Sequence, residues 1–205
     1  MELIVTVAAM AALGVCCAIA ATVQQRRHRR ELAEEKSEYG RAIVIAMPVD
    51  LRGRLEPAVE AAARTRDAAS LAALRDAVVA HVGAVRSASA ATWCGPAAAF
   101  EAWFAERARP SVSDAAVLPA GYREAESGLV VLALGIRHSC ELPPPDAITD
   151  RASLHSTLAN LVPARTMWLA GVLARWEPAA RGASWSEETL ARAFPELRVL
   201  SDGAH

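Results

Sequence analysis

This chain of 205 residues has almost no net charge and contains few cysteines and lysines. The formal net charge is −1, so the chain lacks the basic excess that indicates a nucleic-acid partner. No disulfide framework emerges either, because Cys16 and Cys17 are adjacent in the apolar N-terminal run and only Cys94 and Cys140, which are far apart, lie in the rest of the chain. Lys36 is the only lysine, a bias that a GC-rich genome produces without any functional cause.

The sequence also lacks the short motifs of common enzymes. It contains no phosphate-binding glycine-rich loop, no His-Glu-x-x-His, no Gly-x-Ser-x-Gly and no dinucleotide fingerprint. Each of these motifs places reactive or ligand-binding groups through a fixed spacing, so their absence counts against an ordinary enzyme. We therefore expect no cofactor and no metal, and a non-enzymatic function is favoured.

The chain does have a long uncharged apolar run, over residues 3–23. As a helix, these 21 residues span roughly 31 Å, about the hydrocarbon thickness of a bilayer. The run is followed by a basic cluster that favours the cytoplasmic side: Arg26, Arg27, Arg29 and Arg30. A topology signal alone explains the cluster more simply than the alternative, attraction to anionic headgroups at the membrane surface. We expect a single-pass protein of the bacterial cytoplasmic membrane, with residues 3–23 in lipid, the N-terminus outside and the domain in the cytoplasm.

Two alternatives to a retained anchor are open. Ala18-Ile19-Ala20 resembles a signal-peptide cleavage site, but signal peptides carry positive charge before the apolar core, and here only Glu2 and the terminal amine precede it. Leu13-Gly14-Val15-Cys16 resembles a lipoprotein box, but Val15 is large for the residue before a modified cysteine. Both departures favour an anchor that is kept.

Composition divides the chain into four parts. Residues 1–25 are the expected transmembrane anchor, 26–39 a charged juxtamembrane segment, 40–200 a single domain and 201–205 a tail. The domain is long enough to bury one hydrophobic core. No internal repeat and no second membrane-spanning run are visible in it.

Periodicity predicts an α+β domain with a small, mostly buried sheet and flanking helices, preceded by the N-terminal transmembrane helix. The apolar run 129–136 does not alternate, which is typical of a central strand buried on both faces. Further strands are expected at 42–46, 167–174 and 197–200. Helices are expected over 51–66, from Ser70 to Arg86, from Pro96 to Pro110, from Thr149 or Asp150 to Leu161, and from a capping box Ser184-x-x-Glu187 to Phe194. The small residues 87–92 are interpreted as the end of the second helix.

The second half of the domain resembles a known family in the order of its short motifs. These are Gly128–Ile136, Leu142-Pro143, Val172–Pro178, Trp185–Leu190 and Phe194–Leu197. The family is an uncharacterised group of membrane-anchored proteins of cyanobacteria, other bacteria and chloroplasts that includes the plant fluctuating-light acclimation protein. The resemblance covers about residues 39–200 and implies a strand, helix, strand, helix order but no catalytic residue. The chain departs from the family at Phe194, where tyrosine is common, so the photoprotective role of the plant member does not transfer.

The alternative function is a membrane-tethered hydrolase or thiol-dependent enzyme. Cys140 would be its nucleophile, with His138 or His155 as the base and Asp146 or Asp150 orienting that base. Such a triad depends on spatial neighbours, which the sequence does not define.

A metal site is a weaker candidate. His138 and Cys140 would supply half of it, together with Cys94 and His81, but this spacing matches no known zinc pattern. His81 follows the apolar stripe of its helix, and a core or edge position explains it more simply.

Tryptophans suggest where a partner would bind. Trp176, Pro178 and Trp185 surround one loop and are the candidates for an interaction surface, although packing of the tryptophans is favoured over that role. We expect a non-enzymatic module that binds an unidentified protein or regulates a membrane complex.

Overall fold

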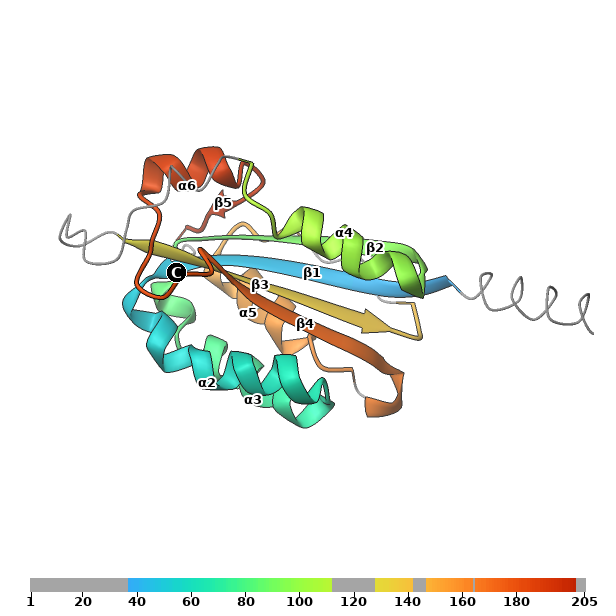
Figure 1. Cartoon of the computed structure of the whole chain (residues 1–205). Helices are drawn as coiled ribbons and strands as arrows, with labels where there is room; N and C mark the ends of the chain where they lie inside the picture. Colours follow the sequence, from blue (N-terminus) through green and yellow to red (C-terminus); the bar gives the residue numbers. More distant parts are fainter. Residues whose placement is uncertain (1–36, 112–127, 142–146, 164, 202–205) are drawn as a thin grey trace, which may run out of the picture. The chain divides into compact units, whose positions relative to one another are not determined.

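A single sheet organises the domain (Figure 1). The computed structural model describes residues 37–111, 128–141, 147–163 and 165–201, and within them five strands follow the order β4-β3-β1-β2-β5. The strands are β1 (Ser37–Pro48), β2 (Ser87–Pro96), β3 (Leu129–His138), β4 (Leu169–Glu177) and β5 (Arg198–Val199). β1 pairs antiparallel with β3, β3 with β4, and β2 with β5.

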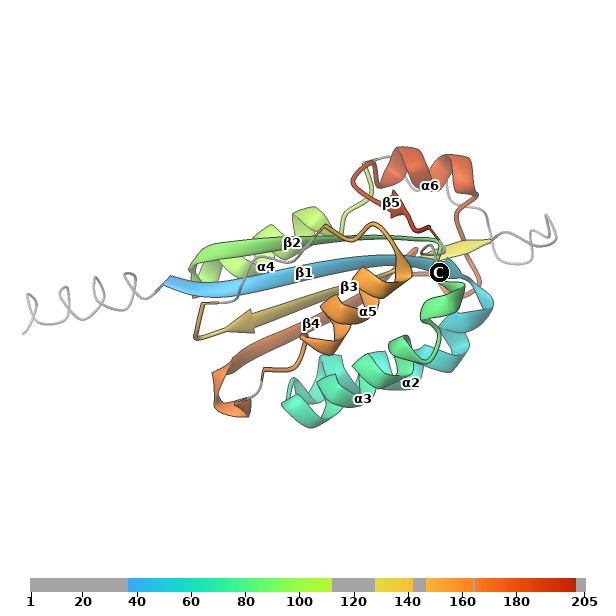
Figure 2. The ribbon, with the colours of Figure 1, turned by 180° about the vertical axis from the view of Figure 1, so that it is seen from behind.

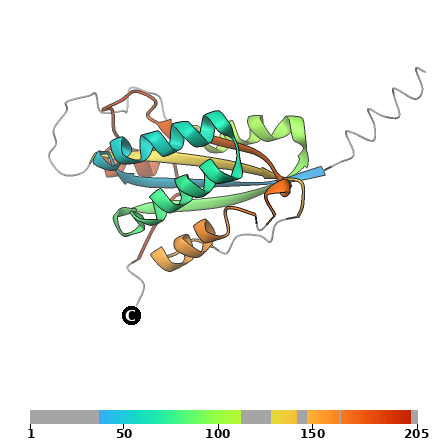
Figure 3. The same cartoon turned by 90° about the horizontal axis from the view of Figure 1, so that it is seen from below.

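Helices cover both faces of this sheet (Figures 1 and 2). They are α2 (Asp50–Thr65), α3 (Ala68–Val79), α4 (Phe100–Arg107), α5 (Arg151–Ala159) and α6 (Glu187–Ala193), with short 3-10 turns η1 (Val82–Ala84), η2 (Ala97–Ala99) and η4 (Thr166–Trp168). Figure 3 shows α2, α3 and α5 together on one face, whereas α4 and α6 pack on the other. The prediction of an α+β domain is confirmed.

The alternation of side chains along β1 explains the two layers. Ile43, Ile45 and Met47 are buried beneath α2, α3 and α5, whereas the smaller Ala42 and Val44 face α4 and α6. The non-alternating run in β3 is buried on both sides, as its pattern predicted. The large side chains of β1 thus pack on one side of the sheet, and its small side chains allow helices to pack closely against the other side.

Two glycines let α4 approach the sheet. A Cβ atom added at Gly135 would lie 2.6 Å from the Phe104 ring, and one added at Gly40 would collide with Phe100. Phe100 and Phe104 stack 6.4 Å apart on the inner side of α4. The helix therefore sits directly on the backbone of β1 and β3.

Several predicted boundaries were wrong. α3 is capped by Asp67, whose carboxylate accepts the Ser70 amide at 2.7 Å, and not by Ser70. The capping box of α6 is formed by Ser186 and Thr189, and not by Ser184 and Glu187. In both helices the predicted cap lay within three residues of the real one, because serine, threonine and aspartate cluster at helix starts and compete for the position.

The largest error concerns β2, which was taken for the end of a helix. α3 ends at Val79, but the apolar stripe continues through Val82 and Val85 because η1 packs against the same core. The strand that follows begins Ser-Ala-Ser-Ala-Ala-Thr, with none of the large β-branched residues that indicate a strand. Its pairing in the sheet therefore overrides a weak local preference.

The membrane predictions fall on residues that the structure does not describe. The apolar run 3–23 and the arginine cluster 26–30 lie outside the described ranges. Across the parts of the chain that are described, every helix is too short or too polar to cross a bilayer.

Candidate functional site

His138, one of the two histidines considered as a catalytic base, is buried in the structure. His138, at the end of β3, is 2% exposed, and its Nδ1 atom has no hydrogen-bond partner in the part of the chain that the structure describes. Burial, and secondarily the nearby Arg41 guanidinium, lower the pKa of His138 to about 4. The ring is therefore neutral at pH 7 and closed off from solvent, which suits a core position better than proton transfer to a substrate.

The other proposed catalytic groups do not join His138. Cys140 is half-buried and makes no hydrogen bond with the described residues, and His155 is exposed on α5. Asp150 caps α5 and accepts the Ser153 amide at 2.7 Å, so its carboxylate already has a structural partner. Asp146 lies outside the described residues. The described geometry thus shows no assembled thiol triad.

The proposed metal ligands are also dispersed. Cys94 is exposed on β2, and His81 is half-buried just before η1. In the described ranges, no group of three or more His, Cys, Asp or Glu side chains is arranged to hold a metal ion.

Trp176, Pro178 and Trp185, the candidates for an interaction surface, are all buried in the structure, which corrects that prediction. Trp185 is fully enclosed and meets the Phe194 ring edge-on at 6.1 Å, while Trp176 is only 8% exposed and Pro178 is buried. Packing, the role that was favoured for the tryptophans, is what the structure shows. A partner would have to meet another part of the domain.

A buried arginine, which the sequence did not single out, holds the loop after β4. The guanidinium of Arg52 donates to the carbonyl oxygens of Pro178, Ala179 and Ala180 at 2.8, 2.8 and 3.0 Å. It also lies 5.5 Å from the centre of the Trp176 ring. The planar guanidinium of arginine holds several N–H donors in a fixed arrangement that can reach three successive carbonyls, whereas the single ammonium group of lysine cannot. This loop is therefore fastened to α2 and serves the fold.

Within the described ranges, the outer edge of β2 is unpaired after its first two residues. β5 pairs only with Ser87 and Ala88. Continuing the same antiparallel register would place residues 195–197 opposite Ser89–Ala91. The chain turns away instead, since the Leu197 amide donates to the Phe194 carbonyl at 3.1 Å, and Pro195 has no amide hydrogen to contribute to a sheet. Among the described residues, Ser89–Ala91 thus have no paired strand on this side.

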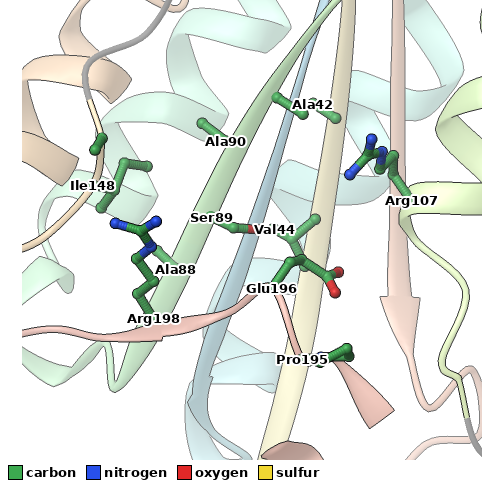
Figure 4. A pocket seen from close by; sticks show the side chains of 12 residues that line it. Ala42, Val44, Ala88, Ser89, Ala90, Arg107, Ile148, Pro195, Glu196 and Arg198 are labelled. Atoms are coloured by element: carbon green, nitrogen blue, oxygen red, sulfur yellow. The ribbon is translucent and has the colours of Figure 1, made fainter.

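A cavity of about 390 Å³ lies over β1 and β2 and extends to Ala147 and Ile148 beside β2, and we call it the β2 slot. Its floor is built from short side chains that include Ala42, Val44 and Ser89. Arg107, in the last turn of α4, and Arg198, on β5, stand at opposite sides of the slot, with Glu196 between them (Figure 4). The volume is within the range of ligand sites in proteins.

The charged residues of the slot are exposed. None of Arg107, Glu196 and Arg198 forms an ion pair or side-chain hydrogen bond with the described part of the chain. Two guanidinium groups and one carboxylate give the slot a net positive charge. An anionic group entering it would meet arginine from either side.

The backbone of β2 also offers bonding groups to the slot. The Leu200 amide donates to the Arg86 carbonyl at 3.0 Å, across the same edge. Because outward-facing groups recur at every second residue of an antiparallel strand, those of Ala88 and Ala90 point the same way. Within the described ranges, nothing pairs with Ala90 on that side. An incoming strand would find a free amide and carbonyl there.

Two smaller cavities are less suited to recognition. One, of about 270 Å³, lies beside Arg137, whose guanidinium already donates to the Ala97 and Ala170 carbonyls. The other, of about 200 Å³, lies between α6 and β5 beside the exposed Val199. Neither combines free charges with an unpaired strand edge, so the β2 slot is the candidate site.

Comparisons with known proteins found no match among family models, curated proteins or solved structures. Function must accordingly be inferred from the residues of this chain.

Proposed function

We propose that this chain is a single-pass membrane protein whose α+β domain works on the cytoplasmic side as a non-enzymatic interaction or regulatory module. The anchor is the apolar run 3–23, and the arginines that follow it set the orientation. The family resemblance of residues 39–200 points to the same membrane-anchored class and stays a prediction.

The observation that carries the interaction role is the unpaired edge of β2 at the β2 slot. Exposed strand edges pair readily with other chains, and proteins usually shield them with lysine, proline, bulges or a covering segment. Among the described residues no strand pairs with the stretch Ser89–Ala91 on this side, and the stretch borders a cavity that Ala147, Ile148 and unpaired charged side chains also line. An edge left unpaired in this way suits a partner that adds a strand.

The enzyme alternative draws less support from the geometry. His138, one of its two candidate bases, is enclosed, and among the described residues Cys140 has no hydrogen-bonded partner that would generate a thiolate. Substitution of Cys140 by serine without any phenotype would remove most of what supports an enzyme.

Site-specific photocrosslinking in native membranes tests the interaction role. A photoreactive residue replaces Ala91, in the slot, or Ala73, an exposed residue of α3 that serves as the matched control. The proposal expects a discrete crosslinked protein from position 91 and none from position 73. Equal labelling from both positions, or no adduct from position 91 in the native host, would contradict it.

A further inference from the structure

We propose that the end of the domain where β1 begins rests on the surface of the membrane, with its exposed tryptophans at the level of the lipid headgroups. We call it the Glu38 end, after a residue at the start of β1. The inference rests on the membrane anchor of the proposed function and adds which part of the domain meets the lipid. Apolar side chains carry the contact, so neutral lipids suffice for it.

Several elements of the domain meet at the Glu38 end (Figure 1). β1 begins there and β3 ends there, because the two strands run antiparallel. Arg137, in β3, pairs with Glu38 at 3.0 Å. The same guanidinium donates to the carbonyl oxygens of Ala97 in η2 and Ala170 in β4, at 3.1 and 3.2 Å. One arginine thus fastens the starts of β1 and β4 and the turn before α4 to each other.

An aromatic cluster covers the α4 side of the Glu38 end. The Trp93 ring, near the end of β2, lies 5.3 Å from the Phe100 ring and 6.4 Å from the Trp103 ring, measured between ring centres. Trp93 belongs to this end because a Cβ atom added at Gly40, in the first part of β1, would lie 3.3 Å from its ring. Phe100 is buried, whereas Trp93 and Trp103 keep part of their surface exposed.

The turn before β4 adds a second apolar group at the same end. Met167 is 78% exposed, and it is one of two large apolar side chains that are exposed in the described ranges. Trp168 beside it is half-buried, and the guanidinium of Arg165 lies 5.2 Å from the centre of its ring. The Ser139 amide donates to the Trp168 carbonyl at 2.9 Å, which holds the turn next to the end of β3.

A bilayer surface suits this set of side chains. In the described ranges, exposed tryptophan surface is confined to the Glu38 end, since Trp176 and Trp185 are buried. The ring of tryptophan is apolar and its N–H group is polar, so the residue is enriched where lipid tails meet water. Arg165 can reach headgroup phosphates while its guanidinium stem stays on the Trp168 ring.

The connection to the anchor also favours this end. Residues 24–36 separate the apolar run 3–23 from β1, and even a fully extended chain of that length reaches no more than about 45 Å. β1 has 12 residues and is itself about 40 Å long. The opposite end of the sheet could therefore touch the bilayer only if the connection ran back, almost fully extended, along the whole sheet. The Glu38 end meets the surface without that requirement.

Charge gives the Glu38 end no preference for anionic lipids. The exposed Arg66 and Arg165 lie there together with the exposed Glu101 and Glu141. Both signs are thus present at the same end, and attraction to anionic headgroups is offset by repulsion. An apolar contact differs from an electrostatic one because added salt does not weaken it.

Fluorescence in lipid vesicles tests the placement. The full chain is reconstituted in vesicles of neutral phosphatidylcholine, with an environment-sensitive dansyl amino acid in place of Met167 or of Val199. Val199 is the matched control, because it is 83% exposed but pairs with Ser87 at the start of β2, the other end of the sheet. Quenching is measured with phosphatidylcholine that carries a nitroxide on the acyl chain close to the headgroup.

The dansyl group at position 167 should be quenched by the nitroxide lipid and emit at a shorter wavelength, whereas the group at position 199 should do neither. Added sodium chloride should leave the quenching at position 167 unchanged. Trp168→Gln should lower the ratio of docked to undocked domain about fivefold, because roughly 40 Å² of apolar contact is lost. Val199→Gln, with the dansyl group at position 167, should have no effect.

Three results would overturn the inference. Equal quenching at positions 167 and 199, or none at position 167, would show that the Glu38 end does not rest on the lipid. Loss of the quenching in salt would show that charge, and not the apolar side chains, holds the domain there. Flotation separates this inference from the proposed function. A chain that floats with the vesicles without quenching at position 167 loses only the inference, whereas a chain that does not float loses the anchor as well.

Discussion

The buried His138 should make this domain less stable in acid. The ring is buried beside Arg41, and its pKa is lowered from 6.5 to about 4. The folded domain therefore binds fewer protons here than the unfolded chain at any pH between these two values. The stability that comes from a neutral His138 is fully present above pH 6.5 and is lost as the pH falls toward 4.

The size of the effect follows from the same two pKa values. Linkage gives a loss of about 2 kcal/mol in the free energy of unfolding between pH 8 and pH 5. The assay is urea unfolding of the full chain followed by tryptophan fluorescence, which reports on the domain because every tryptophan lies between Trp93 and Trp185. His138→Leu keeps the apolar volume but cannot titrate.

The comparison of wild type with His138→Leu isolates this residue, since the other titrating groups are shared. The wild type should lose about 2 kcal/mol more than the variant between pH 8 and pH 5. Equal losses in the two proteins would show that His138 is accessible to protons in the folded state, and the buried position assigned to it would be wrong.

Three further substitutions test the packing, each by urea unfolding. Gly135→Ala should cost about 1–3 kcal/mol, because the new Cβ would lie 2.6 Å from Phe104, and an unchanged midpoint would mean that α4 does not rest on β3. Gly53 lies in α2, and a Cβ atom added there would have no atom within 4 Å. Gly53→Ala should therefore stabilise the domain by about 0.5–1 kcal/mol, because alanine favours a helix more than glycine does. A destabilised variant would show that residue 53 is not helical or that the space around it is occupied. Arg52→Lys should cost about 2 kcal/mol, because an ammonium group cannot reach all three loop carbonyls, and full stability in the variant would argue against the clamp.

Strong local patterns made much of the fold predictable. The unbroken apolar run of β3 and the aromatic face of α4 indicated a strand and a helix without any knowledge of their neighbours. Asp150 was correctly included among the candidate caps of α5. In each of these segments, the pattern of apolar residues favours the same secondary structure that the tertiary packing requires. Such segments can be predicted from the sequence.

β2 could not be predicted because its residues are nearly neutral between helix and strand. Its place is decided by its neighbours in the sheet, and so is the β2 slot, which exists only where β5 stops pairing. Arg52 was missed for a similar reason. A single arginine on a helix gives no sign that three carbonyls from a loop more than 120 residues away will surround it.

The location of the protein is the claim on which the proposed function depends most. Membranes from the native host are washed with alkaline carbonate, and the intact mass of the chain is measured in the pellet and the supernatant. The account predicts that the chain stays in the pellet at its full mass of 21.7 kDa. A soluble chain shortened by about twenty residues would show that the apolar run is a cleaved signal and would contradict a membrane-held module.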